Sequence, residues 1–259
     1  MTLPVLQSDC SSCFGLCCVL LPFSAVSGFG VDKPGGRPCH NLLDDDRCGI
    51  HTTLRADGWP GCTVFECFGA GQQVSQVTYS GVSWREQANL GEMGAVLSVM
   101  RQLHEMLVHL TEVERRSPDP AARAASDEIA ELVTAEPEAL LTYDLDALHE
   151  RVGRLLADAS ARVRRDWPDA EDRSRQDLAG QRLSGDHRGS SLRGAVLIRA
   201  DLRDADLREV DLLGVDLRDA DLRGSDLSTA LFLTQPQVNA ARGDGSTVLP
   251  AGLTRPDHW

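Results

Sequence analysis

The residues in this sequence with the clearest capacity for chemistry are its eight cysteines, which all lie in one short segment. They are Cys10, Cys13, Cys17, Cys18, Cys39, Cys48, Cys62 and Cys67, and the 192 residues that follow contain no other cysteine. A Cys-x2-Cys pair can place two thiolates on one metal ion, because a tight turn brings the sulfurs together. The spacing predicts a cysteine-ligated metal or cluster site in the first 67 residues.

The identity of the metal stays open at this level. Thiolates suit both zinc and iron–sulfur clusters, so either cofactor is expected. Eight cysteines are enough for two four-ligand sites, and the adjacent Cys17 and Cys18 point in different directions, so they could serve two centres. His40 and His51 lie beside cysteines and could replace a thiolate, or be exposed or supporting residues. A secreted disulfide scaffold is the competing interpretation, which the absence of a signal sequence disfavours.

The order of these residues resembles the YkgJ-type family of zinc- or iron-chelating proteins. The resemblance covers roughly residues 10–72. It rests on Cys10-x2-Cys13-x3-Cys17-Cys18, Asp32-Lys33-Pro34, Cys39, Cys48-Gly49-Ile50-His51, Gly61-Cys62 and Cys67. That family includes flagellin lysine methylases believed to use an iron–sulfur cluster, although most of its members have no assigned reaction. The resemblance therefore implies metal binding, and implies catalysis only weakly.

A glycine-containing run, Gly69-Ala70-Gly71-Gln72-Gln73, follows the last cysteine directly. It lacks the third glycine of a dinucleotide-binding fingerprint and the lysine of a P-loop. We expect a tight turn that lets backbone amides approach the sulfur atoms; the alternative is a small loop for a substrate or cofactor. The acidic run Asp44-Asp45-Asp46 is expected to form a solvated loop, and no Gly-x-Ser-x-Gly motif indicates a nucleophilic serine.

A second pattern begins at Leu192, where a large apolar residue recurs at every fifth position. The series is Leu192, Leu197, Leu202, Leu207, Leu212, Leu217, Leu222, Leu227 and Phe232. Five residues advance an α-helix by about 500° and alternate the faces of a strand, so neither element keeps the series on one side. A chain that turns a corner every five residues keeps the series inside a square coil. Such coils stack about 4.8 Å apart through backbone hydrogen bonds.

The run Ala-Asp-Leu-Arg-Asp-Ala-Asp-Leu-Arg within this segment strongly resembles the pentapeptide-repeat family. The resemblance implies a right-handed quadrilateral β-helix. Nine sides amount to little more than two coils, so a cap is expected at each end, with Trp259 as a candidate plug. Some pentapeptide-repeat proteins mimic DNA and bind topoisomerases. Here the arginines that offset the aspartates, and the short rod, disfavour that role.

The chain between the two patterns is expected to be helical. Apolar residues recur at helical spacing from Met93 to Leu110, and Asn89 with Glu92 predicts a capping box before them. A second helix is expected over residues 120–134 and a third after Asp144.

These patterns predict a mixed fold. It comprises a cysteine-rich metal-bound domain (1–85), a small helical unit (86–167), a linker (168–187), a pentapeptide-repeat β-helix (188–233) and a capping tail (234–259).

Composition excludes some classes of function. The net charge is −13, which disfavours a nucleic-acid binder, and no apolar run is long enough to span a membrane. A cytoplasmic location with reduced thiols is expected. The leading hypothesis is a metal-binding protein whose solenoid serves as a scaffold or docks a protein partner. The alternatives are an iron–sulfur-dependent redox or side-chain-modifying enzyme and, third, a topoisomerase-binding DNA mimic, so the question of enzymatic activity stays open.

Overall fold

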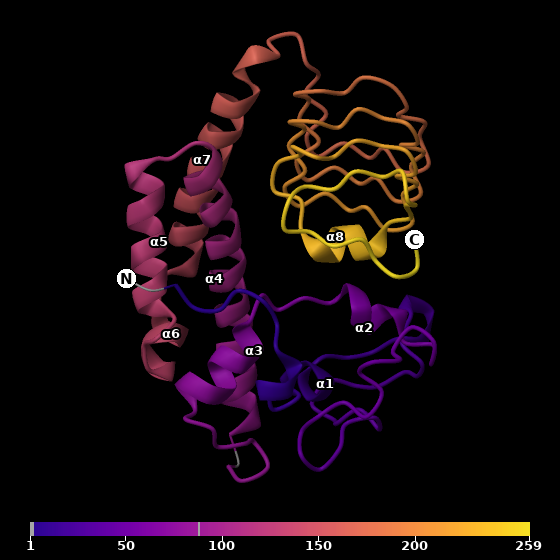
Figure 1. Cartoon of the computed structure of the whole chain (residues 1–259). Helices are drawn as coiled ribbons and strands as arrows, with labels where there is room; N and C mark the ends of the chain where they lie inside the picture. Colours follow the sequence, from indigo (N-terminus) through magenta and orange to yellow (C-terminus); the bar gives the residue numbers. More distant parts are fainter. Residues whose placement is uncertain (1–2, 88) are drawn as a thin grey trace. The chain divides into compact units, whose positions relative to one another are not determined.

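The computed structural model describes residues 3–87 and 89–259, and the chain divides into two compact units, Met1–Leu156 and Ala157–Trp259 (Figure 1). The boundary falls inside helix α7 (Leu145–Val163). The cysteine-rich segment and the helices expected after it therefore belong to one unit rather than two. None of the helices in the described part of the chain has the length and apolar character needed to cross a membrane.

The cysteine-rich segment contains only short elements. They are the 3-10 turns η1 (Cys10–Ser12) and η2 (Ala25–Ser27), the helices α1 (Leu16–Leu20), α2 (Pro60–Val64) and α3 (Ala70–Gln72), and the π-helical turn η3 (Gln73–Thr78). Antiparallel bridges between Phe23 and Lys33 and between Leu42 and Cys48 join its loops. Loops therefore carry much of this segment, as expected for a region that metal ligation is predicted to stabilise.

Helix α4 (Leu90–Arg116) provides the long apolar surface of the first unit. Met93, Met100 and Leu107 are completely buried along it, as the helical spacing predicts. Two further helices of this unit follow it, α5 (Pro120–Leu132) and α6 (Pro137–Thr142). The helix after Asp144 is α7, and the Asp144 carboxylate accepts a hydrogen bond from the Ala147 amide at 3.1 Å. Helix α6 was not predicted, because six residues are too few to show a helical period.

Two local predictions were wrong because distant side chains compete for the groups involved. Asn89 makes no side-chain cap, and Glu92 accepts a hydrogen bond from the Tyr79 hydroxyl at 2.8 Å instead of completing a capping box. Asp46 was expected in a solvated loop but is buried, and its carboxylate accepts a hydrogen bond from Arg85 Nε at 2.7 Å. Both carboxylates accept hydrogen bonds from side chains that local sequence patterns do not predict to be their neighbours.

The second unit contains the expected four-sided coil. Parallel bridges join residues twenty positions apart, for example Asp201 with Asp221 and Asp206 with Asp226, so each coil consists of four five-residue sides. The leucines of the fivefold series are buried inside the coil. Every side turns at a residue two positions after the leucine, and Arg199 and Asp204 take positive φ there. Glycine at equivalent positions, such as Gly194, adopts this conformation without strain.

The region predicted as a linker, residues 168–187, is the first coil of the solenoid, so that prediction was wrong. Asp172, Asp177 and Arg182 bridge to residues nineteen positions later, namely Ser191, Val196 and Asp201. Leu178 and Leu183 are buried in the same core as the repeat leucines. This coil is one residue short, and the irregular step hid it from the fivefold pattern.

The tail after Phe232 extends the other end of the stack. Helix α8 (Gln235–Ala240) begins with a capping box between Thr234 and Gln237. Beyond it, Arg242 and Val248 bridge to Asp221 and Asp226. Trp259 packs against the solenoid core, as expected of a cap, and its indole nitrogen donates to the Ala241 carbonyl at 3.0 Å. Bridges along Asp172, Ser191, Asp211 and Leu231 show four stacked levels, not little more than two.

Aspartate–arginine pairs cover the outside of the solenoid. The shortest join residues two positions apart, such as Asp201 and Arg203 at 2.8 Å, and longer ones reach the next coil, such as Arg203 to Asp221 at 3.7 Å. Pairing between neighbouring coils is therefore present but is the weaker part of the network. Pairs this exposed contribute little stability. Residues 157–259 contain 18 acidic and 15 basic side chains, so the formal net charge of this unit is only −3.

Asp211 differs from the other aspartates of the repeat because it is completely buried. Its carboxylate accepts hydrogen bonds from Arg193 Nη2 at 2.7 Å, from Arg193 Nε at 2.9 Å and from Ser160 Oγ at 2.6 Å. Ser160 lies in the last part of α7, so this buried pair ties the end of that helix to the coil.

Replacement of Asp211 by alanine tests the contribution of this buried pair. We expect Asp211→Ala to lower the free energy of unfolding of the second unit by about 3 kcal/mol, because it removes the buried carboxylate to which Arg193 and Ser160 donate. Asp216→Ala removes the same carboxylate one repeat later, where the pair is more exposed, and should cost less than about 1 kcal/mol. Chemical denaturation measures both, and equal losses would show that burial of Asp211 is not decisive.

Candidate metal centre

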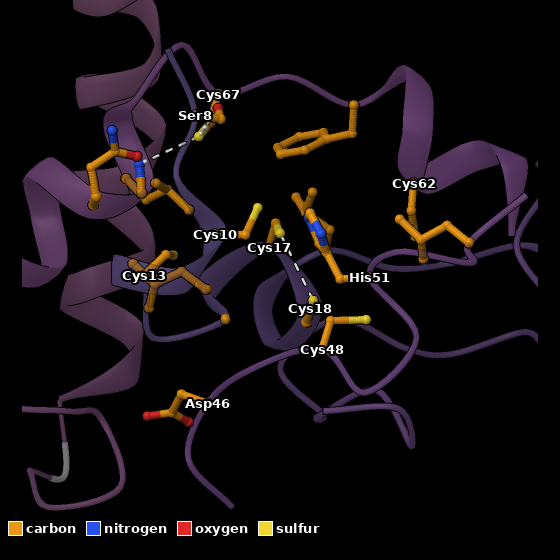
Figure 2. Close-up of a pocket in the computed structure, with 18 of the residues that line it drawn as sticks. Ser8, Cys10, Cys13, Cys17, Cys18, Asp46, Cys48, His51, Cys62 and Cys67 are labelled. Carbon is orange, nitrogen blue, oxygen red and sulfur yellow. Dashed lines mark hydrogen bonds between the residues drawn. The ribbon is translucent and has the colours of Figure 1, made fainter. Parts of the chain in front are cut away.

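Seven of the eight cysteines line one cavity of about 150 Å³ in the first unit (Figure 2). They are Cys10, Cys13, Cys17, Cys18, Cys48, Cys62 and Cys67. The eighth, Cys39, is buried but does not line the cavity. All eight thiols are free, so the competing disulfide interpretation finds no pair here. The cavity has about ten times the space that one water molecule needs.

Different short elements carry the thiols to this cavity. Cys10 begins η1, Cys17 and Cys18 lie in α1, and Cys62 lies in α2. Backbone contacts hold the loop cysteines: the Cys39 amide donates to the Cys18 carbonyl at 3.0 Å, and Cys48 forms the bridge with Leu42. Residues far apart in the sequence are thus gathered without a sheet or a long helix between them.

The turn after Cys67 confirms the expected approach of a backbone amide to a sulfur. The Gly71 amide donates to Cys67 Sγ at 3.5 Å. A Cβ atom on Gly71 would lie 2.8 Å from Cys13 Sγ and 3.6 Å from Cys67 Sγ. Two cysteine sulfurs therefore lie close to one point, and a side chain at position 71 would occupy that space.

Further side chains fix this turn, and the sequence alone did not single them out. The Ser8 hydroxyl lies 3.1 Å from Cys67 Sγ and donates to the Glu66 carboxylate. Glu66 Oε1 also accepts hydrogen bonds from the amides of Cys67 at 2.9 Å and Phe68 at 2.7 Å. His104 Nδ1, buried on α4, donates to the Phe68 carbonyl at 2.6 Å. The Ser8 and His104 contacts join separate parts of the chain, so no sequence motif links them, whereas the bonds from Glu66 to the Cys67 and Phe68 amides are local.

The two histidines predicted as substitute ligands behave differently. His51 lines the cavity (Figure 2). His40 does not line it, and its ring packs edge-on against Trp59 with the centroids 5.3 Å apart. Only His51 is therefore placed to replace a thiolate.

Lys33, the only lysine of the chain, is the residue at this site whose importance the sequence analysis missed. Its ammonium group is buried and donates to the carbonyls of Val19 at 3.2 Å, Leu21 at 2.6 Å, Pro34 at 3.2 Å and Arg37 at 2.8 Å. The ammonium also lies 4.5 Å from the centroid of the Phe23 ring. A lone lysine inside a cysteine-rich segment was the available signal.

Burial keeps most of these thiols protonated in the metal-free chain. It raises the pKa of Cys62 to about 12, with the charges of Cys18, Cys39 and Cys48 adding to the effect. Burial also raises the pKa of Cys39 and Cys48. A metal ion that binds here must displace these protons, so binding weakens as the pH falls.

Among residues 3–87 and 89–259, no three His, Cys, Asp or Glu side chains converge in a geometry that could hold a metal ion. The chemistry of the donors does fit zinc or an iron–sulfur cluster, because many free thiols and one imidazole surround a single cavity.

Comparisons with known proteins confirm the predicted repeat. The family model for pentapeptide repeats matches residues 188–232 in eight copies. The chain is also 50% identical over 266 residues to the uncharacterized protein YybG of Bacillus subtilis (strain 168), covering 98% of this chain and 95% of YybG.

Among solved structures, the chain is similar to the pentapeptide repeat protein Rfr23 from the cyanobacterium Cyanothece 51142. The identity is 29% and the TM-score 0.27, over 30% of this chain and 53% of that one. It is also similar to a pentapeptide repeat protein from the Arabidopsis thaliana thylakoid lumen, at 30% identity and a TM-score of 0.13, over 29% of this chain and 59% of that one. The chain thus spans little more than half of each solved structure.

Replacement of Lys33 tests whether its ammonium group holds the thiol-bearing loops. Lys33→Met leaves buried carbonyls without a donor, which costs about 1–3 kcal/mol for each group that finds no new partner. We expect faster hydrogen–deuterium exchange in residues 18–39, measured by mass spectrometry. Arg37→Met removes a positive charge from the same loop but keeps the Arg37 carbonyl, and should leave exchange unchanged. Similar exchange in both variants would contradict the role given to Lys33.

Proposed function

This chain belongs to the same family as YybG of Bacillus subtilis, and we propose that it is a metal-binding protein whose pentapeptide-repeat solenoid is a scaffold or docking module for a protein partner. The similarity to YybG covers nearly the whole of both chains, so it includes the cysteine-rich segment as well as the solenoid. The proposal therefore concerns the two units together.

The observation that carries the proposal is the gathering of seven free thiols around one cavity. Free cysteines in a protein core usually act as small apolar residues that fill space. Here they surround open space instead. One apolar cluster beside them is small, consisting of Phe23, Cys39 and Trp59 with partly buried neighbours. A bound metal would cross-link the loops around this cluster.

The resemblance to the YkgJ-type family supports the same proposal, since it rests on all eight cysteines in order. Zinc bound by these thiolates would fix the loops, whereas an iron–sulfur cluster would add electron-transfer chemistry. The residues that would hold either are the eight cysteines, with His51 as the one histidine at the cavity.

A second candidate is an iron–sulfur-dependent redox or side-chain-modifying enzyme. The observation that favours it is the apolar wall of the cavity, where Leu21, Phe23 and Phe29 lie among the thiols. Such a wall could exclude water from a reaction beside a cluster. Iron in the purified protein would favour this candidate, and a closed zinc site would favour the structural role.

The charge distribution supports a scaffold rather than a mimic of DNA. Of the thirteen excess negative charges, ten belong to residues 1–156 and only three to the unit that contains the solenoid. The repeat aspartates lie against arginines, so the coil does not present the unbroken acidic stripe that imitation of a phosphate backbone requires. A surface of paired charges is suited to contacts with a protein.

Metal analysis of protein purified without oxygen tests the proposal. We expect zinc, which leaves the protein colourless, or iron with acid-labile sulfide, which makes it brown. The thiols should resist alkylation until the metal is removed, because coordinated thiolates are unavailable as nucleophiles. Protein treated with chelator and reductant is the matched control, in which the thiols should react faster than in the metal-loaded protein. Absence of zinc and iron, together with thiols that react equally before and after treatment, would overturn the proposal.

A further inference from the structure

The turn that presents Cys67 to the cavity is fixed in part by side chains that do not reach the cavity themselves. We infer that Cys67 is a pre-positioned ligand of the metal centre, and that Glu66 and His104 are positioning residues that hold its sulfur in place. Neither Glu66 nor His104 lines the cavity, so both act through the turn and not as ligands. The inference rests on the proposed function and assigns residues outside the set of thiols to the same site.

The backbone directly after Cys67 adopts a conformation that its sequence disfavours. Phe68 has a φ of 52° and Gly69 a φ of 83°, so two successive residues lie in the left-handed region. A bulky residue such as phenylalanine rarely adopts that conformation, and keeps it only where surrounding contacts impose it. Here the Phe68 amide donates to Glu66 Oε1 at 2.7 Å, and His104 Nδ1 donates to the Phe68 carbonyl at 2.6 Å. One local carboxylate and one side chain from α4 therefore fix this residue on both sides.

His104 is a costly choice for its position unless this contact is needed. The side chain is completely buried, and its Nε2 has no hydrogen-bond partner among the residues that the structure describes. A buried polar atom without a partner destabilises a fold, and an apolar side chain would avoid it. Packing alone therefore does not account for a histidine here, whereas the bond from Nδ1 to the turn beside Cys67 does.

The chain around Ser8 adds a contact to the sulfur itself. In Figure 2, Ser8 lies beside Cys67; its Oγ is 3.1 Å from Cys67 Sγ, and its hydroxyl donates to the Glu66 carboxylate. The side-chain amide of Gln72 bonds to the backbone of the residues before and after Ser8, at 2.8 and 2.9 Å. A Cβ atom on Gly69 would lie 2.1 Å from a carbonyl oxygen of this segment. The segment is thus held closely against the turn.

These contacts bear on metal affinity because they fix the sulfur before a metal ion binds. The Gly71 amide donates to Cys67 Sγ at 3.5 Å, so the sulfur has contacts from both the turn and Ser8. A ligand that is already ordered loses little conformational freedom on binding. Removal of the groups that orient a metal ligand typically lowers affinity about 10–100-fold. We expect losses of that size when Glu66 or His104 no longer holds the turn.

Cobalt(II) titration of the full chain, after reduction and treatment with a chelator, tests the role of Glu66. The absorption bands of thiolate-bound cobalt report binding. Glu66→Ala should lower cobalt affinity about 10–100-fold. Glu66→Gln keeps an acceptor oxygen for the same two amides and should restore most of that affinity. Glu105→Ala removes an exposed carboxylate from α4 and should bind as the wild type does. Equal affinities of Glu66→Ala and Glu105→Ala would contradict the role of Glu66.

Replacement of His104 separates positioning from packing. His104→Leu fills the buried space and removes the unpaired nitrogen, but it also removes the donor to the Phe68 carbonyl. Its thermal midpoint should stay close to that of the wild type while its cobalt affinity falls. His104→Asn places an amide donor near the position of Nδ1 and should recover affinity. Wild-type affinity in His104→Leu would show that the histidine serves packing alone.

A double-mutant cycle shows whether both residues act through Cys67. In a Cys67→Ala chain, Glu66→Ala and His104→Leu should lower cobalt affinity no further, because the ligand that they position is absent. The rate at which a chelator removes the metal of the purified protein is a second readout that does not depend on cobalt. Losses that persist in full without Cys67 would overturn the inference and leave metal binding standing. A wild-type chain that binds neither cobalt, zinc nor iron would overturn the proposed function itself.

Discussion

The cysteine-rich segment depends on the buried ammonium group of Lys33, because backbone carbonyls in that segment lack the partners that a sheet or long helix provides. Buried carbonyls must be hydrogen bonded somewhere, and here one cation serves four of them. Two belong to α1 and the residue that follows it, and two to the loop that leads to Cys39. The same contact thus positions both the helix that carries Cys17 and Cys18 and the loop that carries Cys39.

The solenoid depends on a different constraint, which is closure of each coil. After four five-residue sides the chain lies directly beside the start of the previous coil. Backbone bridges in the regular coils therefore join residues twenty positions apart. The coil at the start closes with nineteen residues, and the bridges at the end span twenty-one and twenty-two. The stack tolerates these irregular coils where they meet α7 and α8. The outward-facing aspartates form ion pairs with arginines two residues later. These pairs within the solenoid neutralise most of the negative charge on its surface.

These two constraints explain which features the sequence could predict. A fivefold period is a local property, so the buried leucines of the repeat were identified directly, and helices with long apolar stripes or clear caps were found for the same reason. Leu178 and Leu183 show the fivefold spacing, but the first coil was assigned to a linker because the loss of one residue between Leu183 and Leu192 breaks the period without breaking the coil. At the thiol cavity, the residue types indicated seven cysteines and His51 correctly, whereas Cys39 and His40 do not line it. The contacts of Lys33, Glu66 and His104 join segments that no periodicity relates, and they required the tertiary structure.

The unequal charge of the two units bears on how metal binding is controlled. Residues 1–156 already carry ten excess negative charges, and conversion of buried thiols to thiolates adds more. Burial raises the pKa of Cys13, Cys39, Cys48 and Cys62, so the metal-free thiols stay protonated at neutral pH and the repulsion is avoided. Under the proposed function, each metal ion that binds would release protons and offset the new negative charge, beside the Lys33 ammonium that interacts with Cys39 and Cys18. Competition between metal and proton would then set the affinity of this cavity.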